Sequence, residues 1–163
     1  MNYRFTDIDN DTAKIIKNLI QKDFKHLIQA KIKIIFDTKK RKSAGRYVLG
    51  KLQKTNELLQ YLTAPVSDDA LGYDYMLFLD EKVFTVIDEL DKIRLIRHIL
   101  QYADIDYEAE NPFKIRKEEV LTWYDEIEFN KEDPRWFDRL QVVAESIYNS
   151  DEEESNELVV QSE

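Results

Sequence analysis

The sequence predicts an α+β protein, with a small sheet of three or more strands and helices packed against it. Apolar residues repeat at helical spacing in some segments and alternate with polar residues in others. The order is a helix, three strands, a helix and then further mixed elements, which is typical of an α+β fold. Three glycines and three prolines in 163 residues argue against a loop-rich or repeat-built protein.

The first third of the chain supplies a helix and two strands. Four N-capping residues at 9–12 precede apolar residues spaced for a helix over about 11–29. The segment AKIKIIFD (30–37) alternates lysine with apolar residues, which is typical of a strand. A polar turn, KKRKSAG (39–45), then leads to a second strand in RYVLGKLQK (46–54).

The remainder begins with a short helical turn and a loop. YDYMLFLD (73–80) then predicts a third, well-buried strand, and one or two helices follow over 81–104. The segment NPFKIRKEEVLTWYDEIEFN (111–130) fits a strand and a helix equally well. After the helix-start signal EDP, a last helix is expected near 134–149, and it completes a single domain over residues 1–149. The acidic tail, residues 150–163, is expected to be disordered.

The amino-acid composition limits the cellular compartments and the kinds of partner that we expect for this protein. The chain has no cysteine, which excludes disulfides and thiolate metal sites and fits a reducing cytosol. No stretch approaches about 18 consecutive apolar residues, and the N-terminus lacks the apolar core of a signal peptide, so we expect a cytoplasmic protein without a membrane partner.

The net charge of −9 is unevenly distributed. Counted along the sequence, residues 14–54 carry 13 basic and two acidic side chains, whereas residues 55–163 carry 10 basic and 28 acidic ones. The acidic part suits a partner with a basic groove. Direct nucleic-acid binding is not expected, because the basic block lacks interleaved exposed aromatic residues for base stacking.

One histidine lies where a metal site could stand. In RLIRHILQYADID (94–106), His98 and Tyr102 are four residues apart and point the same way from a helix. A zinc-hydrolase helix of the H-E-x-x-H type needs a glutamate after the first histidine and a second histidine at the fourth position. Ile99 and Tyr102 occupy these positions, so we expect no catalytic residue, metal or cofactor. A half-buried histidine bonded to a neighbour is the simpler interpretation.

Five segments, in this order, resemble the putative phage metallopeptidase family, which consists of small zincin-like proteins. They are IIKNLIQKDFKHLIQAKIKIIFD, GRYVLGKLQKTNELLQYLT, YDYMLFLDEKVF, KIRLIRHILQYADID and, more loosely, WYDEIEF. The resemblance implies a zincin-like scaffold with a helix ending in H-E-L-x-H and a later HDVEEF-like segment that supplies the remaining ligand. The vestigial metal positions in this chain are then His98, Tyr102 and Tyr124. Asp125, Glu128 and Phe129 are retained from the later segment, so the resemblance implies a degenerate site.

Three functions remain open. The first is a non-catalytic, phage-type protein that inhibits a host nucleic-acid-handling protein, such as a sliding clamp, polymerase or nuclease, in the host cytoplasm by mimicking DNA. Its partner-binding residues would be acidic side chains with two aromatic anchors: Asp104, Asp106, Glu108, Glu110, Glu118, Glu119, Asp125, Glu126, Trp123 and Trp136. The second is a hydrolase with an unconventional metal site, made of His98 with Asp91, Asp125 or Glu128. The third is an assembly protein that oligomerises through an apolar helix stripe, and a homodimer is left open.

Overall fold

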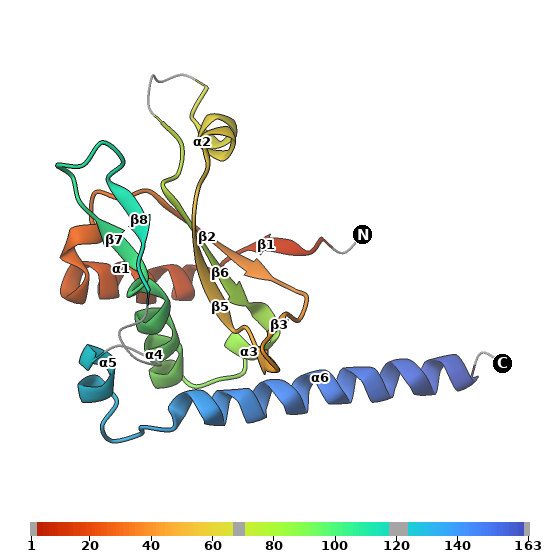
Figure 1. The fold of residues 1–163 in the computed structure, drawn as a ribbon. Helices are drawn as coiled ribbons and strands as arrows, with labels where there is room; N and C mark the ends of the chain where they lie inside the picture. The colour runs from red at the N-terminus through yellow and green to blue at the C-terminus, as the bar shows by residue number, and fades with distance from the viewer. Residues whose placement is uncertain (1–2, 67–70, 118–123, 162–163) are drawn as a thin grey trace.

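The structure is a computed structural model that describes residues 3–66, 71–117 and 124–161. It is α+β, which confirms the predicted fold class (Figure 1). The main sheet consists of β1 (Phe5–Asp7), β2 (Ile32–Asp37), β6 (Tyr75–Asp80) and β5 (Gly50–Lys54), in that order. Two short hairpins pair β3 (Lys42–Ser43) with β4 (Arg46–Tyr47) and β7 (Ala103–Ile105) with β8 (Phe113–Ile115). The helices are α1 (Asn10–Asp23), the 3-10 helix η1 (Lys25–Leu27), α2 (Glu57–Thr63), α3 (Glu81–Phe84), α4 (Glu89–Leu100), α5 (Tyr124–Phe129) and α6 (Trp136–Gln161).

Strand β6 lies at the centre of the main sheet. Its alternate residues Tyr75, Leu77 and Leu79 are fully buried, because they face the core from a strand that is paired on both sides. Strand β2 runs parallel to β6, whereas β1 and β5 are antiparallel edge strands. The alternation over 30–37 and 73–80 therefore predicted the two central strands, β2 and β6, correctly.

Helices α1 and α4 cover one face of the sheet (Figure 1). Helix α4 approaches β5 closely, since a Cβ atom added at Gly50 would lie 2.1 Å from Cδ1 of Ile99. The helix buries side chains around much of its circumference, as expected for a central helix. In the described part of the chain, no helix lies along the opposite face of the sheet (Figure 1), and α6 contacts only its end, where Tyr148 bonds to Asp80.

Helix α1 begins where the sequence predicts and ends earlier. The Asp9 side chain accepts a hydrogen bond from the backbone N–H of Thr12 at 2.7 Å, which caps the helix. The helix stops at Asp23, because Phe24 leaves the helical conformation with a φ of −127° and buries its ring in the core. The predicted helix over 11–29 is therefore a helix followed by the short 3-10 helix η1.

The predicted turn at 39–45 contains a small hairpin. Strands β3 and β4 pair antiparallel, and Ala44 and Gly45 connect them with φ angles of +50° and +76°. Two positive φ values in succession are the geometry that a tight hairpin turn requires. The second predicted strand is consequently divided into β4 and β5.

Replacing Ala44 with glycine is expected to raise the free energy of unfolding by up to about 1 kcal/mol. The Ala44 Cβ is strained at positive φ, although the greater freedom of glycine in the unfolded chain removes part of the gain. Urea unfolding measures the difference, with Ser43→Gly as control at a strand position where φ is not positive. The control should lose stability, and an equal loss in both variants would contradict the strain.

The segment after α4 resolves the ambiguity in the sequence. The predicted helix over 81–104 ends at Leu100, and the chain turns into β7, which pairs with β8. The Tyr75 hydroxyl donates hydrogen bonds to the backbone carbonyls of Asp104 and Lys114, at 3.2 and 2.8 Å, and so attaches this hairpin to the sheet. Residues 107–133 thus contain both a strand and, in α5, a helix.

Helix α6 differs most from the prediction. It continues through Gln161, where the sequence predicts a disordered tail from residue 150, and its outer half projects beyond the sheet (Figure 1). Ion pairs explain part of this order: Glu152 binds Lys40, and Asp151 binds Lys82. No helix in the described residues is long and apolar enough to cross a membrane.

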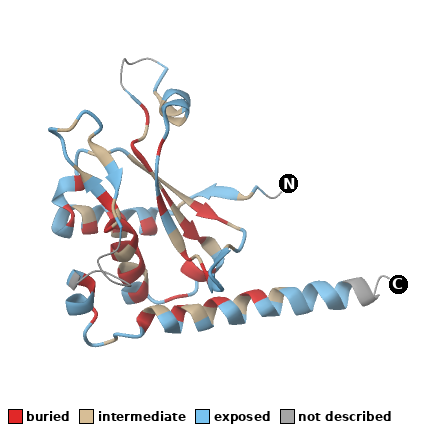
Figure 2. Ribbon diagram, in the orientation of Figure 1, coloured by how far each residue is buried: buried red, intermediate tan, exposed pale blue. Residues whose placement is uncertain are grey.

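The inner half of α6 is attached through buried polar contacts. Tyr148 stacks on Tyr47 at a centroid distance of 5.4 Å, and its hydroxyl donates a 2.5 Å hydrogen bond to Asp80. Burial raises the pKa of Asp80, and burial together with this hydrogen bond raises the pKa of Tyr148. Figure 2 shows the consequence, with buried positions on the inner half of the helix and exposed ones on the outer half.

Candidate functional site around His98

His98 is bonded to a carboxylate from another helix. Its Nδ1 atom lies 3.0 Å from Oε2 of Glu126 in α5, and the two side chains are 17% and 1% exposed. This distance is that of a hydrogen bond between the imidazole and the carboxyl group. The prediction of a half-buried histidine bonded to a neighbour is confirmed.

Aromatic rings surround the histidine. Tyr102 meets the imidazole edge-on at a centroid distance of 5.6 Å, and Phe137 and Trp136 lie at 5.8 and 6.2 Å. Trp136 is 5% exposed, so the first turn of α6 closes the site on one side. These contacts place His98 in an aromatic cluster between α4 and α6.

Helix α5 is held over α4 by Arg97. Its guanidinium lies 3.9 Å from the centroid of the Phe129 ring, and Nη1 donates a 2.7 Å hydrogen bond to Asp23. This arrangement turns Glu126 inward and leaves its neighbours Asp125 and Glu128 exposed. The sequence did not single out Glu126 as the partner of His98, because that choice required knowing that the segment is helical.

The position of the general base is part of the core. Ile99 is 1% exposed and points at Gly50 of β5. An aliphatic side chain wedged between a helix and the sheet can neither accept a proton nor contact a substrate. The neighbouring Tyr102 is half-buried against His98. Tyr124 is the first residue of α5, and its side chain lies outside the described part of the structure.

The carboxylates of the alternative metal site are not brought together. Asp91 is buried two turns before His98 and binds Arg94 and Arg139, at 3.0 and 2.7 Å. Glu128 is exposed and pairs with Lys131 at 3.2 Å. Asp125 lines a polar cleft of about 450 Å³ together with Arg97. The hypothesis of a metal site made of His98 with these carboxylates therefore has no geometric support.

The donors that the structure describes do not fit the zinc ion that an H-E-x-x-H scaffold implies. A catalytic zinc takes three protein ligands, and His98 with Glu126 supplies two. Over residues 3–66, 71–117 and 124–161, no group of three or more His, Cys, Asp or Glu side chains is placed to hold a metal ion. The Tyr102 phenol is a poor third ligand, because it must first lose a proton near pH 10.

The residues predicted to bind a partner fall into three groups. Asp104, Asp106, Glu108 and Glu110 are exposed along β7 and the turn that follows it, and Asp125 is exposed on α5. Glu126 and Trp136 are buried in the His98 cluster, so in this structure they offer no contact surface. Glu118, Glu119 and Trp123 lie outside the described residues.

Comparison with known proteins identifies the scaffold. The sequence model of the family described as "Putative phage metallopeptidase" matches residues 4–148, which is most of the chain and includes the sheet, α4 and α5. No curated protein matches the chain. No solved structure matches it either. The segments that carry the resemblance all lie within the matched range, and the chain belongs to the putative phage metallopeptidase family.

Proposed function

We propose that this protein is a non-catalytic member of its family that binds and inhibits a host protein with a basic, nucleic-acid-binding surface. One observation carries the proposal. The position of the general base, Ile99, is buried against Gly50, while Glu126 occupies Nδ1 of His98. The scaffold is retained, and a packing residue, Ile99, replaces the glutamate that hydrolysis needs.

The missing groups cannot be supplied by small movements. A positioned general base contributes about 10² to 10⁴ in rate, and Ile99 has no proton acceptor to contribute. Rotating Glu126 away from His98 would leave a buried carboxylate without its imidazole partner. The cluster around His98 therefore packs α4, α5 and α6 together.

The acidic surface is most concentrated on the outer half of α6. Five of the seven residues from 151 to 157 are acidic, and at about 1.5 Å per residue they span roughly 10 Å of helix. This is one carboxylate per about 2 Å, close to the roughly 1.7 Å per charge along a DNA duplex. Asp151 and Glu152 bind lysines of the body, whereas Glu153, Glu154 and Glu157 are exposed.

A second acidic surface is the β7–β8 hairpin. The four exposed carboxylates at 104, 106, 108 and 110 lie on β7 and the turn, and the Asp106 side chain accepts a hydrogen bond from the backbone of Glu108. Exposed carboxylates of this kind attract a basic protein and speed its association, and salt weakens the attraction. Both surfaces support a cationic partner.

Two measurements test the proposal. We expect no hydrolysis of a mixed peptide library with zinc present, and no zinc retained after gel filtration. We also expect the immobilised protein to capture a DNA- or RNA-handling protein from a host lysate at about 50 mM salt and to compete with nucleic acid for the purified partner. Hydrolysis that requires His98 would contradict the proposal.

Charge variants assign the surface. One triple variant neutralises α6, Glu153→Gln/Glu154→Gln/Glu157→Gln, and the other neutralises the hairpin, Asp106→Asn/Glu108→Gln/Glu110→Gln. The affinity for the captured partner should fall at least about tenfold in the variant whose surface binds it. This is the effect of losing about 0.5 kcal/mol or more per charge. The matched control neutralises three exposed carboxylates elsewhere, Asp11, Glu57 and Glu132. Equal capture by all three variants would exclude both acidic surfaces.

A further inference from the structure

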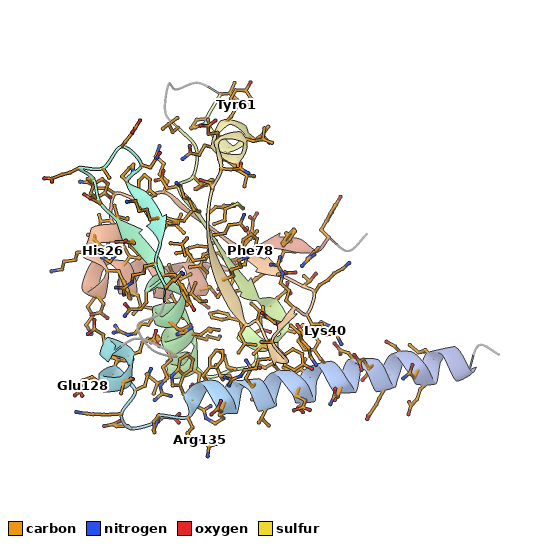
Figure 3. The ribbon with its side chains drawn as sticks, viewed as in Figure 1. His26, Lys40, Tyr61, Phe78, Glu128 and Arg135 are labelled. Atoms are coloured by element: carbon orange, nitrogen blue, oxygen red, sulfur yellow. The ribbon has the colours of Figure 1, made fainter. Side chains whose placement is uncertain are left out.

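The uncovered face of the main sheet displays aromatic and basic side chains together. The strand register places Asp7, Ile35, Phe78 and Lys51 in one row across the four strands, with Phe5 in the next row. Phe5 is 44% exposed, and Ile35 and Phe78 are half-buried. Figure 3 shows Phe78 on the side of the sheet away from α1 and α4. We name the surface formed by Phe5, Ile35, Phe78 and Lys51 the open face.

The two phenylalanine rings form a platform with cations above it. Their centroids are 5.9 Å apart. The guanidinium of Arg4 lies 5.0 Å from the Phe5 centroid, and that of Arg41 lies 5.4 Å from the Phe78 centroid. A planar, cationic group already lies over each ring, in the place that a nucleobase would take by displacing it.

Charge on the open face is predominantly positive. Arg41, Lys39 and Lys51 line one crevice with Phe78, and Lys33 lies in the adjoining row. With Arg4 these are five cations, against three carboxylates: Asp7, Asp37 and Asp80. Asp37 forms ion pairs with both Arg4 and Arg41, so its single negative charge balances only one of the two arginines. Burial raises the pKa of Asp80.

We propose that the open face binds single-stranded nucleic acid, with bases stacked on Phe5 and Phe78 and phosphates paired with the surrounding lysines and arginines. Stacking needs the flat side of a base, which only an unpaired strand offers, and it is tolerant of sequence. A base on Phe78 takes the place of the Arg41 guanidinium, which then pairs with a neighbouring phosphate. This binding is separate from the acidic surfaces and does not depend on the proposed function.

The sequence alone argued against this chemistry, because the basic block over 14–54 contains no suitable aromatic residues. The fold supplies them from outside the block. Phe5 comes from the N-terminal strand and Phe78 from β6, and each is placed beside the block by pairing with β2.

Carboxylates of helix α6 border the basic surface at one end of the sheet. Lys40 and Lys82 border the same end of the sheet, and their partners Glu152 and Asp151 line a cleft of about 580 Å³ with them and with Lys39. These two carboxylates would repel an approaching phosphate. Removing them should therefore extend the surface available to a nucleic-acid strand.

The test is fluorescence anisotropy of the full chain with labelled 15-nucleotide single strands, oligo(dT) and oligo(U), at about 50 mM salt. Phe5→Leu/Phe78→Leu should weaken binding at least about tenfold, because leucine keeps apolar bulk but cannot stack. Lys51→Gln should reduce the slope of log affinity against log salt by about 0.7. Asp151→Asn/Glu152→Gln should strengthen binding, and Lys22→Gln on α1 is the matched control and should not change it.

Three results would overturn the proposal: no binding of either strand by the wild-type protein, equal binding of a duplex, or binding that survives loss of both rings. A thermal melt of each variant separates loss of binding from loss of fold, and Lys51→Gln tests the face without touching its apolar residues. If the wild type instead self-associates in a manner that requires Phe5 and Phe78, the open face is a contact between copies of this chain. The Phe5→Leu/Phe78→Leu variant should still capture the basic partner protein as the wild type does. Its loss of nucleic-acid binding can then be separated from any failure of the acidic surfaces.

Discussion

Replacing Asp91 with alanine is expected to lower the free energy of unfolding by about 3–5 kcal/mol. The Asp91 carboxylate is 2% exposed and receives hydrogen bonds from Arg94 within α4 and from Arg139 of α6. Removing it leaves the mostly buried guanidinium of Arg94 with one carboxylate partner, Asp133, instead of two. Breaking a buried ion pair from one side is costly, because the remaining charge stays desolvated.

The size of this effect can be checked against an exposed pair. Asp138 binds Arg46 at the surface, both about half exposed, so Asp138→Ala should cost no more than about 1 kcal/mol. Urea unfolding at pH 7 gives both values. Equal costs would show that the Asp91 pairs contribute no more than surface pairs do.

The contribution of Asp91 should also depend on pH. Hydrogen bonds from Arg139 and then Arg94 outweigh burial and hold the pKa of Asp91 below its usual value. A carboxylate with a depressed folded pKa stabilises the protein above the unfolded pKa of about 3.9, and the stabilisation is lost as the pH falls through the folded value. The difference between wild type and Asp91→Ala should therefore be constant from pH 7 to about 5 and shrink below about pH 4.

Replacing Ile99 with glutamate, the residue that an H-E-x-x-H helix requires, is expected to destabilise the protein by about 4 kcal/mol or more. The substitution removes a fully buried aliphatic side chain and places a carboxyl group against Gly50. Since native domains are stable by only about 5–15 kcal/mol, the substitution should remove a large part of the free energy of unfolding at neutral pH. Ile99→Val is the matched control, with an expected cost of about 0.5–1.5 kcal/mol.

The pH dependence of Ile99→Glu has the opposite sign to that of Asp91. Burial would raise the pKa of the introduced carboxyl, so the variant should regain stability as the pH falls and the group becomes neutral. Tyr102→His, by contrast, changes a half-buried position and should be tolerated. A stable Ile99→Glu/Tyr102→His double variant that binds zinc would contradict the view that packing closes the site.

Local patterns in the sequence predicted much of the fold because they act through neighbouring residues. The acceptor at Asp9 starts α1, and the alternation over 30–37 and 73–80 gives the central strands and their buried faces. The edge strand β1 was not predicted, because three residues carry no period and the strand exists only through its pairing with β2. Similarly, the outer half of α6 was predicted to be disordered, since its ion pairs join residues 69 and 112 positions apart.

At the candidate site, too, the sequence determined some features and the tertiary structure decided others. The sequence by itself determined that Ile99 and Tyr102 stand where a base and a ligand would be needed, because residue type limits chemistry wherever a side chain lies. Only the tertiary structure decided that Glu126, and not Asp125 or Glu128, meets His98, since that depends on how α5 is rotated over α4. It also decided that Phe5 and Phe78 share one face with the basic block. Such placements arise from strand register and helix packing between distant segments, and no local pattern encodes them.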